Sequence, residues 1–161
     1  MAGEGPIRAR LERDLSAMEI PARFVGWVEG EAKQKLFDEA DLLVFPSTWP
    51  EPFGLVGLEA AAAGLPAVAF DLGGIREWLV PGRTGELAPA TPPSSGGLGQ
   101  AIARAAQSAA NLERLGDAAR EHSLLFNVKR HLAGLEAILQ EALHERSAVP
   151  RVPGEQPPVS P

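Results

Sequence analysis

Two glutamates with seven residues between them, Glu51 and Glu59, are the side chains of this sequence best suited to chemistry. Glu51 lies between two prolines. Because a residue before proline is restricted to extended backbone angles, a stiff turn should aim its carboxylate. Glu59 falls in a run rich in leucine, valine and alanine, which predicts a helix buried on nearly all sides. A carboxylate there needs a partner, because an unpaired charge is costly to bury.

Each glutamate also has a simpler, structural interpretation. Glu51 could be an acid near a helix N-terminus, which stabilises a helix by about 0.3–1 kcal/mol. Glu59 could form an internal ion pair with an arginine. Side chains on a helix lean toward its N-terminus, however, so Glu59 should point toward the turn that holds Glu51 and Gly54.

Gly54 adds a place for an anion between the two glutamates. A residue without a side chain lets a ligand approach the backbone amides of Gly54 and Leu55 at the positive end of the predicted helix, where phosphates commonly bind. A phosphate at these amides, a diol on Glu59 and a reacting group near Glu51 would together form a nucleotide-sugar site.

The elements that would position these residues alternate between strand and helix. Short apolar runs predict strands at residues 24–28, 42–45 and 67–70, and residues 53–64 read as the helix joining the last two. Two strands joined by a helix at this spacing form a parallel crossover, with a ligand crevice at the carboxyl ends of the strands. We therefore expect an α/β fold: a Rossmann-like parallel sheet with helices on both faces.

Other elements are predicted from periodicity and from turn residues. Helices are expected at residues 7–20 and 31–40, the latter with Lys33 and Lys35 on a solvated face, and another should start at Glu77. An edge strand is expected at 85–88 and three helices between 98 and 144. The helical period predicts these core positions in the last two: Leu112, Leu115, Ala119, Leu132, Leu135, Ile138 and Leu139.

Several motifs around the glutamates resemble one known family. The residues are Pro46-Ser47, Glu51-Pro52-Phe53-Gly54-Leu55-Val56, Glu59-Ala60, Gly64-Leu65-Pro66 and Gly73-Gly74-Ile75-Arg76-Glu77. Over roughly residues 3–144 the chain resembles the group 1 (retaining, GT-B fold) glycosyltransferases. The glutamate spacing alone is a weak signal, but with Pro-Phe-Gly inside it and Gly-Gly-x-x-Glu downstream it is specific.

The resemblance implies roles for the residues of the central motif. Glu51 would contact the donor sugar and act as the catalytic residue. Glu59 would accept the ribose hydroxyls, and the amides of Gly54 and Leu55 would hold the diphosphate.

The resemblance also implies roles for backbone segments on either side. The backbone at Val25 and Gly26 would lie beside the nucleobase, and amides of Gly73 and Gly74 would face the donor side of the cleft.

Three further side chains lie near this proposed cleft in the sequence. Trp49 and Trp78 would flank the cleft, although packing in the core or at the rim is their simpler role. Arg76 is expected to be an unpaired surface arginine.

The amino-acid composition disfavours several classes of partner and cofactor. Fifteen basic against twenty-one acidic residues give a net charge of −6, which disfavours nucleic acid and anionic membranes as partners. Without cysteine there is no disulfide partner and no thiolate chemistry. Three scattered histidines and the lack of an Asp-x-Asp motif favour neither a metal nor another cofactor. No apolar run is long enough to span a membrane, and a cytoplasmic location is expected.

The resemblance covers part of a longer architecture. Residues 1–146 would form a partial GT-B C-terminal, nucleotide-sugar-binding domain, and the Pro-rich residues 147–161 a disordered tail. An acceptor-binding N-terminal domain, and a loop supplying an arginine and a lysine to the diphosphate, would lie before Met1. The isolated fragment is therefore expected to be inactive.

The sequence is compatible with three functions. The chain could be the donor-binding part of a retaining glycosyltransferase of the hexosyltransferase type. It could be a non-catalytic remnant that binds a nucleotide, or a partner through an open sheet edge. It could also belong to another GT-B-like enzyme, such as an epimerase or a phosphorylase. The pair of Glu51 and Glu59 favours the first.

Overall fold

The computed structural model of the protein describes the backbone of residues 1–148 and the side chains of residues 1–144. The chain divides into two compact units, the first ending at Ser123 and the second beginning at Leu124. Of the predicted Pro-rich tail, residues 147 and 148 end a helix, and the rest lies outside the described residues.

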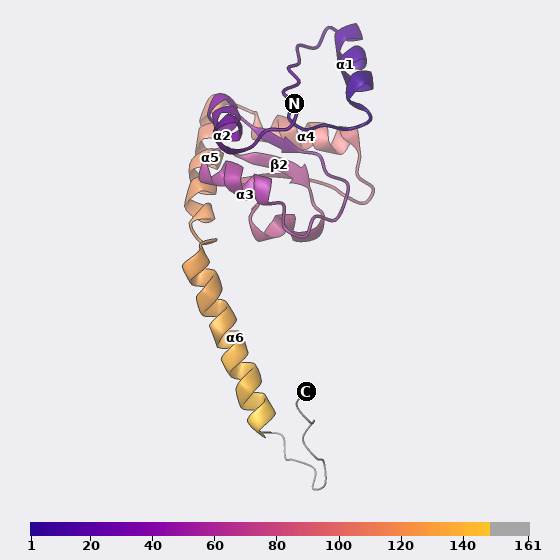
Figure 1. Ribbon diagram of the computed structural model, residues 1–161. Helices are drawn as coiled ribbons and strands as arrows, with labels where there is room; N and C mark the ends of the chain where they lie inside the picture. The colour runs from indigo at the N-terminus through magenta and orange to yellow at the C-terminus, as the bar shows by residue number, and fades with distance from the viewer. Residues whose placement is uncertain (149–161) are drawn as a thin grey trace. The chain divides into compact units, whose positions relative to one another are not determined.

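The first unit is built on a parallel sheet of three strands in the order β1-β2-β3 (Figure 1). These are β1 (Leu43–Phe45), β2 (Ala67–Phe70) and β3 (Gly85–Ala88). All four residues of β2 are buried. Because successive side chains of a strand point to opposite faces, the sheet is covered on both sides. The predicted α/β fold and the strand at 67–70 are confirmed.

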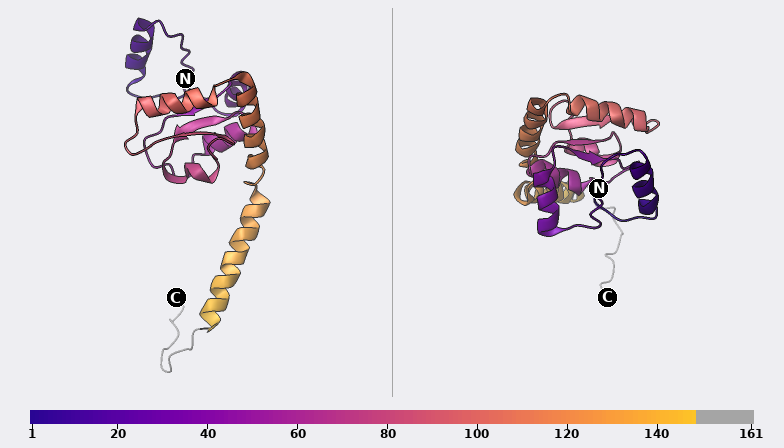
Figure 2. Two further views of the ribbon diagram at one scale, coloured as in Figure 1. Left: turned by 180° about the vertical axis from the view of Figure 1, so that it is seen from behind. Right: turned by 90° about the horizontal axis from the view of Figure 1, so that it is seen from above.

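The first unit also contains helices. In chain order they are α1 (Arg8–Ala17), α2 (Gly30–Glu39), α3 (Leu55–Ala62), the short 3₁₀ helix η1 (Gly73–Glu77), α4 (Ser95–Ala105) and α5 (Ala109–Ser123). α4 packs on β2 and β3, whereas α3 packs on β1, β2 and α5. Figures 1 and 2 show α3 and α4 on opposite sides of the sheet. The second unit contains α6 (Val128–Ala148).

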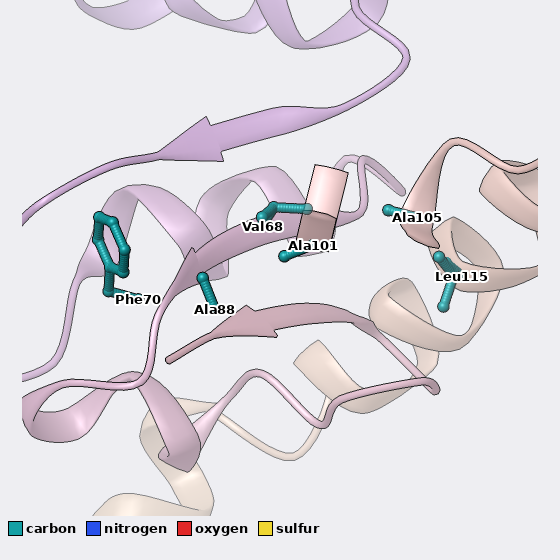
Figure 3. Close-up of a cluster of buried hydrophobic side chains, with 6 residues drawn as sticks. All are labelled: Val68, Phe70, Ala88, Ala101, Ala105 and Leu115. Carbon is teal, nitrogen blue, oxygen red and sulfur yellow. The ribbon is translucent and has the colours of Figure 1, made fainter. Parts of the chain in front are cut away.

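Two apolar clusters hold the first unit together. The larger joins β2, β3, α4 and α5 and is drawn in Figure 3: Val68, Phe70, Ala88, Ala101, Ala105 and Leu115. The smaller joins α2 to α3 through Phe37, Ala60 and Leu65. The central strand and the helix following β1 are thereby fixed to their neighbours, which is what a site at the ends of the strands requires.

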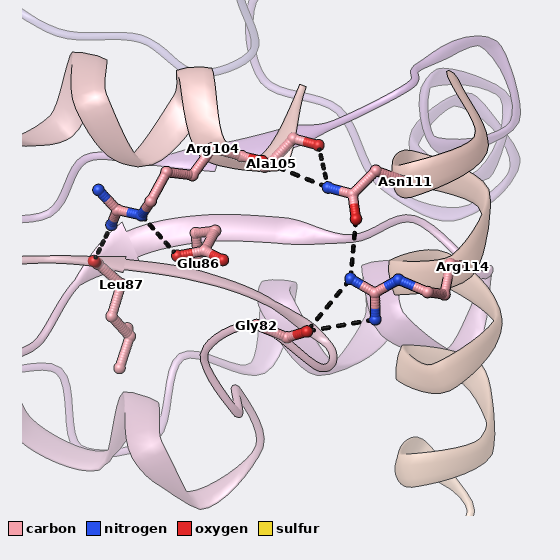
Figure 4. Close-up of polar contacts among 7 residues, drawn as sticks. All are labelled: Gly82, Glu86, Leu87, Arg104, Ala105, Asn111 and Arg114. Atoms are coloured by element: carbon pink, nitrogen blue, oxygen red, sulfur yellow. Dashed lines mark hydrogen bonds and ion pairs between the residues drawn. The ribbon is translucent and has the colours of Figure 1, made fainter. Parts of the chain in front are cut away.

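Polar contacts tie α4 and α5 to the loops around β3 (Figure 4). The Asn111 side chain donates to the carbonyl of Ala105 at 2.8 Å, satisfying a carbonyl at the C-terminal end of α4. Arg114 donates to Asn111 Oδ1 at 2.8 Å and to the carbonyl of Gly82 at 3.2 Å. These bonds fix the turn that precedes β3.

Two predicted elements are wrong. Residues 24–28 form no strand, because only Gly26 makes an isolated parallel bridge, with Ala2. The φ of Gly26 is +73°, which is not extended and breaks a ladder at this residue. The helix expected from Glu77 is replaced by η1, which ends there. The adjacent residues Trp78 and Leu79 are 2% and 1% exposed, and burial of consecutive residues does not fit one face of a helix.

Two burial predictions are also wrong. α3 is not buried on nearly all sides, since it buries only Gly57, Ala60 and Ala61, and Leu55 is 67% exposed. Leu115 and Ala119 are core residues as predicted. The predicted core positions of α6, however, are between 45% and 64% exposed: Leu132, Leu135, Ile138 and Leu139. Periodicity identifies the apolar face of a helix but not the surface that covers it.

Replacing Gly57 with alanine is expected to destabilise the first unit by about 1–3 kcal/mol, the usual cost of overpacking. A Cβ at this position would lie 2.0 Å from Trp78 Cη2, and that ring is buried. Gly99→Ala in α4 is the matched control, because no atom beyond the adjacent residues and the backbone of its own helix lies within 4 Å of the added Cβ, and alanine favours a helix by about 1 kcal/mol relative to glycine. Urea unfolding measures both variants. A Gly57→Ala protein as stable as Gly99→Ala would contradict the packing described.

Candidate functional site

The turn after β1 carries Glu51 and is held from two sides. Ser47 Oγ donates to Glu51 Oε1 at 3.0 Å, and the Glu51 side chain is half-buried. The backbone amide of Gly74 donates to the Glu51 carbonyl at 2.8 Å. The carboxylate is thus positioned by its own turn, and that turn is fastened to the segment following β2.

The two glycines that follow β2 are required by this close approach. A Cβ at Gly73 would lie 2.2 Å from the Glu51 carbonyl oxygen, and one at Gly74 would lie 2.1 Å from that of Pro52. Both contacts are far shorter than backbone atoms allow. The Gly-Gly pair therefore packs main chain against main chain on the Glu51 turn. Glu51, Gly73 and Gly74 are brought together, although the sequence separates them by more than twenty residues.

Gly54 begins α3 in the left-handed region, with a φ of +80°. Its conformation favours glycine, because other residues are strained there. No side chain caps this helix end. Below it, Trp78 Nε1 donates to the carbonyl of Phe53 at 2.6 Å. The hydrogen bond from Trp78 thus fixes the residue before Gly54, and no side chain of the described residues caps the amides of the first turn of α3.

The two tryptophans have different environments. Trp78 is 2% exposed and packs under α3, so its role is structural, which is the simpler of the two interpretations. Trp49 is 73% exposed in the turn that carries Glu51. Only Trp49 is therefore accessible to a ligand on this side.

Glu59 forms an ion pair that the sequence did not indicate. Lys33 Nζ of α2 lies 2.8 Å from both Glu59 oxygens, and the side chains are 29% and 47% exposed respectively. The structural alternative for Glu59, an internal ion pair with an arginine, is wrong about the partner, and the placement of Lys33 on a solvated face is also wrong. No local pattern links residues on two helices. Only the packing of α2 on α3 brings them together.

Arg76 is also paired, contrary to expectation. Its Nε donates to Asp71 Oδ1 at 2.6 Å, and a second guanidinium nitrogen bonds the other carboxylate oxygen. The hydrogen bond that Arg76 donates to Asp71 raises the pKa of Arg76 above its usual value. Asp71 is the first residue after β2, so Arg76 is held at the end of this strand by an ion pair.

Val25 and Gly26 contact the N-terminal residues. The Val25 amide donates to the Met1 carbonyl at 3.0 Å, and the Gly26 carbonyl accepts from the Gly3 amide at 2.7 Å. Hollows of about 430 and 210 Å³ lie nearby, beside α1, and neither is lined by Glu51, Gly54 or Glu59. A cleft shared by Glu51 and Glu59 remains a prediction.

Within residues 1–144, no three or more His, Cys, Asp or Glu side chains gather closely enough to hold a metal ion. None of the described helices is both long and apolar enough to cross a membrane.

Comparison with known protein families identifies the family of this chain. The sequence profile described as "Glycosyl transferases group 1" matches residues 1–122. The chain belongs to this family. This group 1 glycosyltransferase chain is 39% identical over 127 residues to a glycogen synthase of Mycobacterium tuberculosis, covering 75% of the chain and 29% of that relative. It is 42% identical over 79 residues to an uncharacterized glycosyltransferase of Methanocaldococcus jannaschii, covering 48% of the chain and 20% of the relative.

Solved structures of glycosyltransferases share the fold. The group 1 chain matches a sucrose-phosphate synthase from Thermosynechococcus elongatus with a TM-score of 0.71 and 30% identity, over 89% of the chain and 37% of that structure. It matches the Anabaena protein HepE in complex with UDP-glucose with a TM-score of 0.66 and 25% identity, over 92% of the chain and 40% of that structure. The chain therefore spans well under half the length of these relatives.

Proposed function

We propose that this chain is the donor-binding part of a retaining glycosyltransferase that transfers a hexose from a nucleoside-diphosphate sugar to an acceptor. The observation that carries the proposal is the meeting of the Glu51 turn, the start of α3 and the Gly73-Gly74 turn. All three follow β1 or β2, and parallel α/β sheets bind ligands at the carboxyl ends of their strands. The UDP-glucose complex of the Anabaena protein supports a nucleotide-sugar donor.

Each part of the donor has a proposed partner. The diphosphate binds the amides of Gly54 and Leu55, where the helix end favours an anion. Glu59 accepts the ribose hydroxyls, and Glu51 contacts the sugar that is transferred. The amide of Gly74 already bonds Glu51, so we assign the donor-side amide of the turn to Gly73.

The remaining assignments are proposed from the family resemblance and from the composition of the sequence. We place the nucleobase beside the backbone of Val25 and Gly26. The acceptor would be held by a separate N-terminal domain, the reaction would need no metal, and the protein would act in the cytoplasm. These assignments make nucleotide binding the proposed role of this chain. The affinity of the chain for nucleotides is therefore the most direct test.

Replacing Glu59 with glutamine is expected to weaken nucleoside diphosphate binding by about 1.5–3 kcal/mol, the range for hydrogen bonds to charged groups. The neutral amide keeps the shape of the side chain but loses an ionised acceptor. Wild type and variant are titrated with UDP, GDP and ADP, and chemical shifts of backbone amides are followed because binding should be weak.

Glu113→Gln on the exposed face of α5 makes the same chemical change away from the site. It should bind like wild type. Equal affinities for wild type and Glu59→Gln would show that Glu59 does not bind the ribose.

A further inference from the structure

Lys33 holds the carboxylate to which the ribose is assigned. Its ammonium lies at the same distance, 2.8 Å, from both oxygens of Glu59. We propose that Lys33 is a positioning residue that sets the Glu59 carboxylate for a vicinal diol, and so makes the site selective for ribonucleotides. This inference rests on the proposed function, because it deepens the role of Glu59.

The number of acceptor sites on a carboxylate supports this role. An ionised carboxylate offers about four lone-pair sites, two on each oxygen. The Lys33 ammonium bonds both oxygens and so uses one site on each. One site on the outer side of each oxygen remains, so a ribose hydroxyl can bond an oxygen while the ion pair persists. The ion pair and the ribose can therefore share Glu59.

The packing of α2 on α3 keeps Lys33 in place. Phe37, one turn further along α2, is 9% exposed and packs against Ala60, the residue next to Glu59. Lys33 is itself only 29% exposed, whereas Lys35 on the same helix is 76% exposed and lies 3.7 Å from Glu39. Lys33 is thus held against α3, whereas Lys35 projects into solvent.

Glu59 benefits from such a partner because of its own exposure. A glutamate that is 47% exposed on a short helix can adopt several rotamers, and binding a diol would have to select one. The ammonium selects that rotamer before the ligand arrives. Preorganisation of this kind increases affinity by lowering the ordering cost of binding.

The test compares two ligands that differ only in the diol. The ribonucleoside diphosphate that binds best among UDP, GDP and ADP is titrated beside its 2′,3′-dideoxy counterpart. Wild type should prefer the ribonucleotide by about tenfold or more, the ratio that corresponds to bonds with a charged group. Lys33→Met should lower this preference about threefold to tenfold by weakening ribonucleotide binding, with dideoxynucleotide binding unchanged.

Two further variants separate positioning from a general effect of charge or stability. Lys33→Arg keeps a cation beside Glu59 and should retain most of the preference. Lys35→Met removes a lysine from the same helix, and should retain all of it.

The outcomes distinguish this inference from the proposed function. A wild type without preference for the ribonucleotide would overturn the ribose role of Glu59, and the inference with it. A preference that survives in Lys33→Met would overturn the role of Lys33 alone. Equal weakening of both ligands would show a merely structural lysine, and tighter ribonucleotide binding by Lys33→Met would show that the ammonium competes with the diol.

Discussion

The 161 residues by themselves are expected to transfer no sugar at a measurable rate, whereas a longer protein carrying the same residues behind an acceptor domain should be active. Transfer requires the acceptor to be held against the donor, and such positioning can lower a barrier by about 7–11 kcal/mol. The departing diphosphate also needs its growing charge stabilised, which is commonly the largest catalytic effect. The start of α3 would supply only part of that stabilisation.

The measurement is transfer of labelled sugar from a panel of nucleotide sugars. The chain alone is compared with a fusion in which the N-terminal part of a family member precedes it. Nucleotide binding by both proteins serves as the control for a folded donor site. Robust turnover by the isolated chain would show that it is a complete enzyme and would overturn the proposed division of roles.

Glu51→Ala in the longer, active protein is expected to reduce the turnover number by about 10²–10³-fold, the range for losing one preorganised electrostatic contact in a transition state. The side chain follows β1 in a turn fixed by Pro50, Pro52 and the Gly74 amide, so alanine should remove the carboxylate and leave the turn intact. Nucleotide affinity should change little, because the diphosphate and ribose are assigned to other residues.

Two further variants serve as references for the effect of Glu51→Ala. Ser47→Ala removes the hydroxyl that bonds Glu51 Oε1 and should have a smaller effect, about 0.5–1.5 kcal/mol, typical of one hydrogen bond. Glu113→Ala, on the exposed face of α5, should leave transfer unchanged. If Glu51→Ala transfers sugar at the wild-type rate, Glu51 has no catalytic role.

Local sequence signals predicted the centre of the fold well. The apolar run at residues 67–70 coincides with β2, and the predicted helix at 53–64 contains α3. Proline, glycine and apolar patterns act through the backbone within a few residues, so they identify such elements. The sequence also paired the Glu51 turn with the Gly-Gly turn, but only through the family resemblance. The reason for two glycines, a main-chain contact with Glu51 and Pro52, became visible in the structure.

What the sequence could not predict depends on contacts between distant elements. Lys33 and Glu59 are 26 positions apart, and their pairing follows from the way Phe37 packs on α3. Gly26 reads as part of a strand from its neighbours, but its positive φ excludes it from one. Small residues likewise misled the burial prediction for α3, because Gly57, Ala60 and Ala61 suffice to pack the helix while Leu55 remains exposed.

The hydrogen bond from the Gly74 amide to the Glu51 carbonyl gives the turn a built-in reporter. A bonded amide exchanges its proton with solvent only when the bond opens, so the exchange rate measures the free energy of that local opening. The Gly74 proton therefore records how often the turn carrying Glu51 separates from the segment after β2. Its rate can be followed in solution without any substrate and without altering a single residue.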